Sequence, residues 1–534
     1  MYGEYGKFLP YRAMSDVLVD NYLRTFETVH RILHVPTFRA EYDRLWQDND
    51  IHGSNNHRLN GFVVQVQLCC ALGALLYDEA FSLRAQAMQW AREATAWLET
   101  PTKTLLDFAS IQTMCLHMLT YESLQGPFGD RVWILSGAVT RAAMLVGLHR
   151  DPTKLPGVSR GLAEVRRRLW MTVLELTLGS CLDPGAAPLL SLDDSDCAPP
   201  SNFDDIQLDP RPETSGVENH TAPVPETMDH YTDSSLQIIL GRTLPARLAV
   251  ARFATGLRAH DYQEAVQLSE KYATACRELS ASLRALRPCL PEFQRQYCEM
   301  AMARYTFTLH VPYMVVGIKH PAAYMLSRKA CVDAAVGLLH SCFSASSMAT
   351  EPLLAAVHHN LNVGESIDAM QRDDFVRLCV TGSGPFRSAP FQALMIITAE
   401  LTAMADENQS SIRWSSDMRA LELLSLLRVA TDWAKRRVKA GHECNRDHAF
   451  IELSLASVEA LMKGEAVEES VEARGKAACL EEKAILEGMA PTGDATWDGV
   501  PSEEWSSPGY DLLGDDEMWL MQASNFVDFD FMGL

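Results

Sequence analysis

Residues 131–152 read RVWILSGAVTRAAMLVGLHRDP, and the spacing of their apolar side chains decides the fold class. The apolar residues recur at every third or fourth position, at Val132, Leu135, Val139, Ala142 and Val146. This period places them on one face of a helix. A proline lacks the backbone donor that a helix needs, so the stretch predicts an amphipathic helix that ends in a turn at Pro152.

The same helical period covers most of the chain, which predicts an all-α fold. A first helix is expected near residues 15–31, with Ser15 as its N-cap. Further helices are expected at residues 61–98, 104–122, 163–182, 235–258, 262–286, 292–318, 325–345, 350–371, 388–405, 415–440 and 446–463. No run of about 18 apolar residues predicts a membrane span, and the N-terminus lacks the pattern of a secretory signal. We therefore expect no membrane partner.

Three segments organise the chain. Residues 1–15 are a short N-terminal segment, and residues 16–463 form one large multi-helix body. Within this body, residues 184–229 hold eight prolines and predict a long irregular loop. Residues 464–534 begin as a charged helix, to about residue 488, and end in a disordered tail. The tail combines many acids with aromatic residues and lacks basic ones, a composition typical of amphipathic disordered segments.

The charge and the cysteines limit the partners and the compartment. The net charge is −22, which predicts repulsion from bare nucleic acid unless a basic patch overrides it. The densest basic runs are residues 166–168 and KRRVK at residues 435–439, and both are interpreted as solvated helix faces. A nuclear-import signal is the alternative for KRRVK. The thirteen cysteines are scattered without a C-x-x-C pair, which favours a reducing compartment.

Two stretches look catalytic but lack the required context. The His149-Arg150-Asp151 triplet imitates a kinase catalytic loop, which needs an asparagine five residues after its aspartate. Here Pro156 stands at that position. The GVSRG stretch at residues 157–161 imitates a hydrolase nucleophile elbow, which needs a buried strand before the serine. The preceding residues are polar and contain prolines, so we expect no catalytic residue.

Two other stretches resemble metal sites. In HECNRDH, residues 442–448, the histidines lie six positions apart and so do not share one helix face as zinc-protease ligands do. The DDSDC stretch, residues 193–197, resembles the acidic cluster of helical isoprenoid synthases, which remain the alternative enzyme class. It lies in the proline-rich loop, where solvated or capping aspartates are the simpler interpretation. We therefore expect no metal site and no cofactor in this chain.

Several ordered motifs carry a family resemblance. They are the turn GLHRDP, the following EVRRRLW, the stretch YLRTFETVHRILHVPTFRAEYDRLW at residues 22–46, and the loop LLSLDDSDCAPPSNFDDIQL at residues 189–208. Together they resemble the middle regulatory domain of fungal zinc-cluster transcription factors, and the resemblance extends over residues 16–463. The matching motif residues are His34, Pro36, Trp133, His149, Arg150, Asp151, Arg167, Trp170 and Asp205.

The resemblance implies a nuclear transcription regulator and not an enzyme. A regulator of this type would activate a pathway-specific gene set, for example one for a secondary metabolite. In physical terms, His149 and Arg150 would close a helix, where positive charge meets the helix dipole. Trp170 would pack in the core, and the arginines of residues 166–168 would pair with acids of the 193–205 loop.

The family pattern departs from this chain at the N-terminus. Family members usually begin with a zinc cluster of six cysteines that contacts DNA, whereas residues 1–68 contain no cysteine. Zinc is therefore expected only if a missing N-terminal cluster exists. DNA would be contacted through such a domain, or indirectly through a partner. A homodimer is possible, and a co-regulator or repressor without its own DNA binding is the alternative function.

The C-terminal tail is the expected contact with a coactivator or the transcription machinery. Its aromatic anchors would be Trp519, Phe526, Phe529 and Phe531. Aromatic side chains of such a tail would dock in apolar grooves of the partner. The interleaved acids would keep these aromatics exposed and steer the encounter with basic partners.

Overall fold

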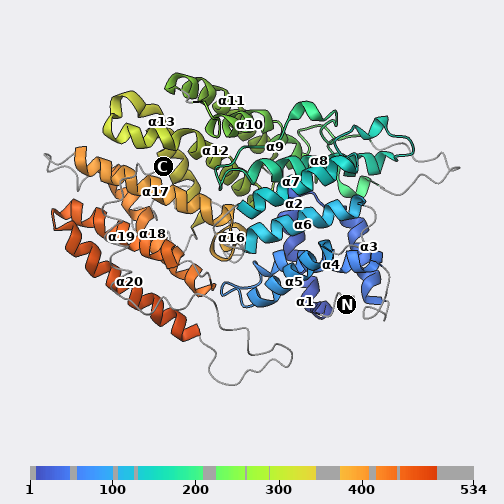
Figure 1. The fold of residues 1–534 in the computed structure, drawn as a ribbon, viewed down its shortest axis with the longest axis horizontal. Helices are drawn as coiled ribbons and strands as arrows, with labels where there is room; N and C mark the ends of the chain where they lie inside the picture. The colour runs from blue at the N-terminus through green and yellow to red at the C-terminus, as the bar shows by residue number, and fades with distance from the viewer. Residues whose placement is uncertain are drawn as a thin grey trace.

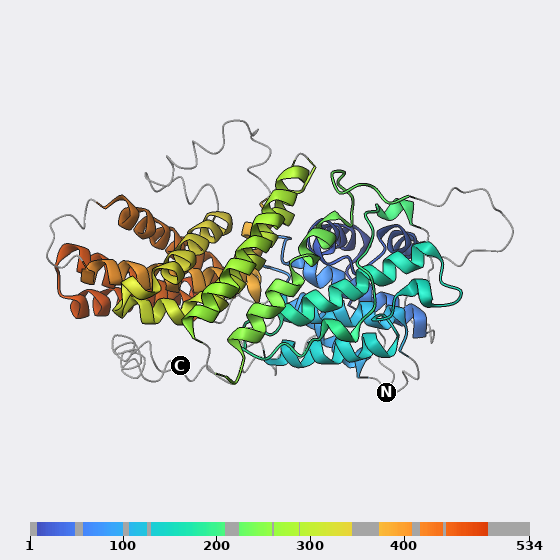
Figure 2. The same ribbon diagram turned by 90° about the horizontal axis from the view of Figure 1, so that it is seen from above.

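The computed structural model describes residues 8–47, 57–99, 106–124, 130–208, 224–258, 261–287, 289–343, 373–407, 417–441 and 445–489. All regular secondary structure in these ranges is helical, which confirms the all-α class. In Figure 1 the N-terminal helices, blue to teal, lie on the right, and the C-terminal helices, orange to red, lie on the left. Figure 2 shows light-green helices between these two groups, with the yellow helix among the orange ones.

The first half of the chain builds the right-hand group. In chain order its helices are α1 (Arg12–Arg24), α2 (Phe26–His30), α3 (Val35–Gln47), α4 (His57–Ala74), α5 (Arg84–Leu98), α6 (Phe108–Leu124), α7 (Asp130–Leu145), the 3-10 turn η1 (Pro152–Lys154) and α8 (Arg160–Gly179). Two further 3-10 turns follow, η2 (Leu192–Asp194) and η3 (Asp205–Gln207). Helix α4 is central, because α1, α5 and α6 all pack on it.

The packing of α1 on α4 requires a glycine. A Cβ added at Gly73 would lie 1.9 Å from the carbonyl oxygen of Leu18, so no larger residue fits without moving a backbone. The buried Asn21 side chain donates to the Gly73 carbonyl at 3.0 Å across the same contact. This close approach brings α1 and the following α2 onto the core.

The second half builds the remaining groups. Its helices are α9 (Ser235–Gly241), α10 (Leu244–Ala254), α11 (Tyr262–Leu286), α12 (Glu292–Lys319), α13 (Pro321–Cys342), α16 (Asp374–Thr381), α17 (Pro385–Glu407), α18 (Met418–Lys439), α19 (Asn445–Lys463) and α20 (Val467–Met489). The long helix α12 packs on α13, α10 and α17. It therefore joins the two ends of the molecule.

Several helix boundaries differ from the expectations. Ser15 is not an N-cap: it is buried inside α1, which begins at Arg12, and its hydroxyl donates to the Pro10 carbonyl at 2.9 Å. The run 61–98 is two helices, because Asp78 accepts from the Ser82 amide at 3.0 Å and fixes a turn between them. The run 235–258 is likewise two helices, and a proline stands in the first turn of the second one.

Other expectations hold or lie outside the described residues. The described part of the proline-rich segment contains 3-10 turns but no α-helix, and the charged helix after residue 464 is α20. The expected helix at 350–371, the tail with its four anchors, and His442 fall outside the described residues. Within those residues, no helix has the length and apolarity needed to cross a bilayer.

Candidate functional site

The sequence motifs converge on one buried carboxylate. Asp205, in η3, accepts hydrogen bonds from the guanidinium groups of Arg31 and Arg168, and it also accepts from the Val35 amide at 2.9 Å. The side chains of both arginines are buried, with 3% and 1% of their surface exposed. Burial alone would raise the pKa of Asp205, but the two positive charges lower it to about 2. The carboxylate is therefore charged and bridges two cations.

The backbone around Asp205 is held in the same network. His34 Nε2 donates to the Asp205 carbonyl at 2.9 Å, and His34 Nδ1 accepts from the Thr37 hydroxyl at 2.7 Å. Arg31 ends α2 in the left-handed region, with φ of 51°. Pro36 is exposed in the first turn of α3, where a missing amide donor costs nothing. The N-terminal motif thus positions the partners of Asp205.

A second buried carboxyl lies beside this network. Glu27 accepts from the Tyr22 hydroxyl at 2.6 Å and from the Leu33 amide at 2.9 Å. Burial raises the pKa of Glu27 to about 7, although Arg31 and the donated hydrogen bonds lower it. Glu27 thereby connects α1 and α2 to the turn that precedes α3.

Asp151 is the centre of a second set of contacts. It accepts from the Thr153 amide at 2.9 Å and from the Ala198 amide at 3.1 Å, and it pairs with Arg167 at 3.2 Å. These hydrogen bonds and the Arg167 charge outweigh burial and hold the pKa of Asp151 well below its usual range. Arg167 also pairs with Glu164 at 2.6 Å. The carboxylate of the kinase-like triplet is therefore engaged in structural hydrogen bonds and an ion pair.

The proline-rich loop is fastened to the same turn. Arg150 pairs with Asp196 at 3.3 Å, and the Asp151 amide donates to Asp196 at 2.8 Å. The Asp196 amide in turn donates to the His149 carbonyl at 3.1 Å. The His149 ring lies 6.2 Å from the ring of Trp170, which is buried in the core as expected. The loop and the turn after α7 therefore form one unit.

The expected role of the arginine run is partly right. Its pairing with the 193–205 loop is confirmed for Arg168, but the run is not a solvated face. Arg166 donates to the carbonyls of Val146 and Gly147 at 3.3 Å and 3.1 Å. It therefore satisfies the orphan carbonyls at the end of α7. Arg150, which was expected to complement the helix end, pairs instead with the loop.

The KRRVK run at residues 435–439 is also not a solvated face. Arg437 is buried and donates to the carbonyls of Cys379, Val380 and Gly382 at 2.7, 3.1 and 2.9 Å. Lys435 and Arg436 pair with acids of other elements, Glu481 and Glu79. The run therefore holds α18 against its neighbours, which weakens its interpretation as an import signal.

Aspartates 193 and 194 are exposed, as expected.

Trp133 anchors the proline-rich segment at its other end. Its indole Nε1 donates to the Ala187 carbonyl at 3.1 Å. This contact joins α7 to the chain that leaves α8. The sequence-predicted motif residues therefore lie in α7, in α8, in the turn between them, in η3 of the proline-rich segment, or in the N-terminal motif.

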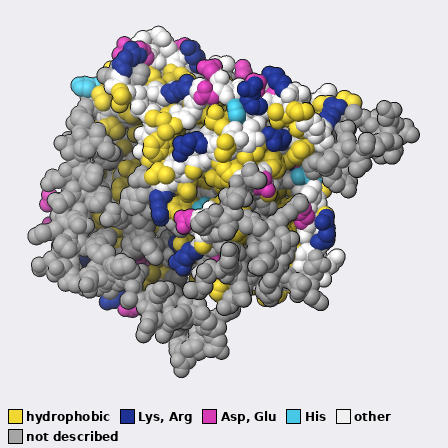
Figure 3. Space-filling model, turned by 45° about the vertical axis from the view of Figure 1, so that its right-hand side comes forward, with side chains coloured by type: hydrophobic (Ala, Val, Ile, Leu, Met, Phe, Trp, Pro, Cys, Tyr) yellow, Lys and Arg dark blue, Asp and Glu magenta, His cyan; other side chains and the backbone are white. Residues whose placement is uncertain are grey.

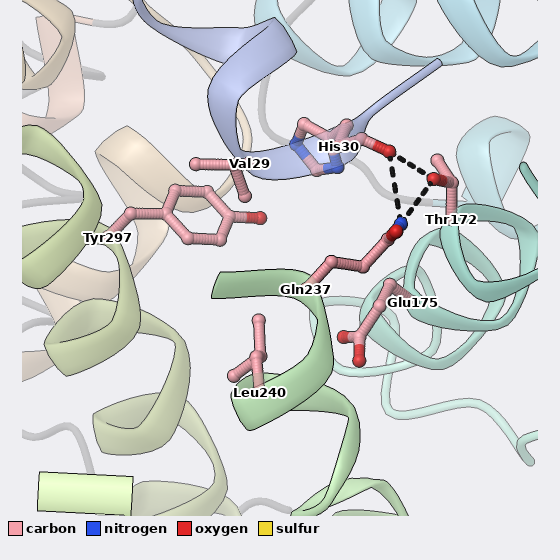
Figure 4. Close-up of a pocket in the computed structure, with 7 residues that line it drawn as sticks. All are labelled: Val29, His30, Thr172, Glu175, Gln237, Leu240 and Tyr297. Atoms are coloured by element: carbon pink, nitrogen blue, oxygen red, sulfur yellow. Dashed lines mark hydrogen bonds between the residues drawn. The ribbon is translucent and has the colours of Figure 1, made fainter. Parts of the chain in front are cut away.

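A small cavity lies next to the Asp205 network (Figure 4). It is lined by Val29, His30, Thr172, Glu175, Gln237, Leu240 and Tyr297. The His30 carbonyl accepts from the Thr172 hydroxyl and, at 3.4 Å, from Gln237 Nε2. The centre of a water molecule can occupy about 10 Å³ of this cavity, so the cavity has room for roughly one water. Burial lowers the pKa of His30 to about 4, so its ring is neutral. In this conformation the cavity is too small for an organic effector.

The arrangement is suited to holding elements together and not to chemistry. Asp205, Asp151 and Glu164 are each held by arginines and backbone amides. Sequence reasoning selected Arg167 and Asp205 but missed Arg31 and Glu27. Both residues lie inside the N-terminal motif at residues 22–46, yet nothing in the sequence signals that Arg31 meets Asp205 far along the chain or that Glu27 is buried beside it.

Comparison with known proteins finds one family and several fungal relatives. The fungal specific transcription factor domain matches residues 19–239, a range that contains all the motif residues. Transcription factor opdR of Penicillium oxalicum is 33% identical over 419 residues, which cover 76% of this chain and 48% of opdR. Transcription factor lepE of Aspergillus flavus is 32% identical over 420 residues, which cover 75% of this chain and 47% of lepE. The aspyridones cluster regulator apdR of Emericella nidulans is 26% identical over 419 residues, which cover 75% of this chain and 52% of apdR.

The chain spans about half the length of the curated relatives it matches. No solved structure matches it. The matched domain and the relatives are transcription factors and not enzymes, which agrees with the expectation from the sequence.

Proposed function

The chain belongs to the proteins that carry the fungal specific transcription factor domain, and from this premise we propose that it is a nuclear regulator that activates the genes of one secondary-metabolite pathway. The observation that carries the proposal is the similarity to transcription factors over three quarters of the chain, one of them a regulator of the aspyridones cluster. The target genes would lie in a biosynthetic cluster of the host.

The helical body would act as the regulatory part of this protein. Its motif residues are engaged in a network that joins α2, α3, α8 and the proline-rich loop through Asp205. A buried network of this kind fixes one arrangement of the elements, since each unpaired charge would be costly. The body would therefore present a defined surface to partner proteins.

Contact with DNA would come through a zinc-cluster module or through a DNA-bound partner. The chain carries a net charge of −22, which opposes binding to bare DNA. On the face shown in Figure 3, Lys and Arg side chains are scattered among Asp and Glu and do not gather into one patch. Zinc as a DNA-binding cofactor belongs to such a module.

The segment after α20 would carry the activation function. Residues 490–534 contain ten Asp or Glu, seven aromatic residues and no Lys or Arg. Aromatic anchors such as Trp519 and Phe529 would enter apolar grooves of a coactivator, and the acids would keep them in water until contact.

A reporter assay tests activation by this segment. The full chain is fused to an unrelated DNA-binding module, and transcription is compared with that of a variant that ends at residue 509. We expect the truncation to abolish activation, and substitution of Trp519, Phe526, Phe529 and Phe531 by alanine to do the same. Unchanged activation by both variants would refute the role of the tail, and repression below the basal level would favour the co-regulator or repressor.

Deletion of the gene in its host tests the pathway assignment. The expected result is the loss of transcripts from one co-located group of biosynthetic genes, with other clusters unchanged. If no biosynthetic gene responds while other genes do, the protein regulates a different process.

A further inference from the structure

One histidine and three carboxylates meet where α20 packs on α19, far from the motif network (Figure 1). His448 and Glu452 lie one helical turn apart on α19, with His448 Nε2 3.8 Å from Glu452 Oε1. Glu482 of α20 lies on the other side of the ring, with its Oε2 3.9 Å from His448 Nδ1. One ligand atom from each of His448, Glu452 and Glu481 lies within 4.8 Å of the other two.

The His448 ring is buried and has no hydrogen bond to any described residue. Its side chain is 0% exposed, and neither ring nitrogen has a hydrogen-bond partner within the described residues. Oε1 of the buried Glu482 is also without a partner there. Leaving such a buried polar group unsatisfied costs about 1–3 kcal/mol, and native structures contain few of them. A ring nitrogen that faces carboxylates at just under 4 Å is arranged to share a cation with them.

We propose that His448 Nε2, Glu452 Oε1 and Glu481 bind one Zn²⁺ ion. Imidazole nitrogen together with carboxylate oxygens is a ligand set that zinc accepts, with a water in the fourth position. Bond lengths of about 2.0 Å in a tetrahedral site separate neighbouring ligand atoms by about 3.3 Å. The 3.8 Å between Nε2 and Oε1 therefore needs to shorten by only about 0.5 Å.

The outer contacts of this site support the assignment. Glu482 faces His448 Nδ1, where a carboxylate orients a zinc-binding imidazole and fixes Nε2 as the ligand. Glu452 accepts from Arg474 through Oε2 at 2.8 Å, which leaves Oε1 directed at the ring. His448 and Glu452 thus each have an outer partner on α20.

Lys435 of α18 is the competitor for the ion. Its ammonium group lies 2.9 Å from Glu481 and 3.9 Å from Glu452 Oε1, so it neutralises the carboxylates that would bind zinc. Zinc would displace this ammonium group from the carboxylates. The ion would then fasten α20 to α19 and stabilise the last described helix before the acidic segment.

Zinc binding to the full chain tests the proposal. The chain is stripped with a chelator and titrated with Zn²⁺ in a calorimeter. The expected result is one binding event that His448→Gln and Glu481→Gln abolish and that Glu482→Gln weakens roughly 10- to 100-fold. Lys435→Met should tighten it, because the competing ammonium group is gone. Glu472→Gln is the matched control, since Glu472 lies on the same helix and pairs with Lys476.

Cysteine thiols could also bind zinc, and cobalt separates the two kinds of site. A Co²⁺ complex of His448 and carboxylates lacks the thiolate-to-metal charge-transfer band that a cysteine site gives. Glu481 is partly exposed, so Glu481→Gln leaves the core intact and keeps the test valid if His448→Gln unfolds the protein. Equal zinc affinity of the unmodified chain and Glu481→Gln would overturn the proposal, as would a thiolate band that accounts for all bound cobalt.

Discussion

Removal of the charge at Asp205 tests the central network directly. In Asp205→Asn, the guanidinium groups of Arg31 and Arg168 remain buried but lose their shared carboxylate. Breaking a buried ion pair in this way costs about 3–5 kcal/mol. An unfolding entropy of about 2.1 cal/mol/K per residue gives about 1.1 kcal/mol/K for 534 residues. The melting temperature should therefore fall by about 3–5 °C.

Thermal unfolding followed by circular dichroism measures this loss, with Asp193→Asn as the control. Asp193 is an exposed acid of the same loop, so its substitution should change stability by no more than about 0.5 kcal/mol. The pKa of Asp205 is lowered to about 2, so its stabilisation is present above the unfolded value near 3.9 and is lost as the pH falls towards 2. The melting temperatures of Asp205→Asn and of the control Asp193→Asn should therefore converge over this acidic pH range. Equal melting temperatures at neutral pH would refute the proposed role of the network.

Four further results are expected from unfolding experiments. Gly73→Ala should destabilise the protein by about 1–3 kcal/mol or more, because its Cβ would lie 1.9 Å from the α1 backbone. Unchanged stability would show that α1 and α4 can move apart at this contact without cost. Gly337→Ala, at an exposed position of α13, should stabilise the protein by about 0.5–1 kcal/mol, because the added Cβ would meet nothing within 4 Å in the described residues beyond the adjacent helix backbone. A loss of stability would contradict this open space. Arg437→Met should lower the free energy of unfolding by about 1–3 kcal/mol, because it leaves buried carbonyls unpaired. Lys439→Ala changes an exposed residue of the same run and should be neutral. Similar melting temperatures of the two variants would disprove the packing role of the KRRVK run. Burial raises the pKa of Glu122 to about 7, so the stabilisation by Glu122 is present below the unfolded value near 4.3 and is lost as the pH rises towards 7. In urea titrations, Glu122→Gln should flatten the dependence of the free energy of unfolding on pH. An unchanged dependence would exclude Glu122 as its source.

Parts of the candidate site could be predicted from local patterns. The turn after α7 follows from its glycine and proline, and burial of Trp170 follows from its position on the apolar face of α8. The expected pairing of the arginine run with the acidic loop was correct for Arg168 and Asp205. The prediction that Ser15 caps a helix was wrong, because a capping side chain is recognised by composition while the start of α1 depends on its packing.

The sequence by itself determined the helical class, most helix positions and the irregular loop at residues 184–229. These features follow from hydrophobic periodicity and turn-forming residues, which act between residues a few positions apart. Only the tertiary structure decided which charges are buried. Asp205 bridges Arg168, 37 positions away, and Arg31, 174 positions away, so the pairing depends on how α2, α8 and the loop pack. His448 meets carboxylates of α20 for the same reason. A charged residue shows its own type in the sequence, but its partner is fixed by the three-dimensional crossing of elements whose packing is driven by their apolar faces.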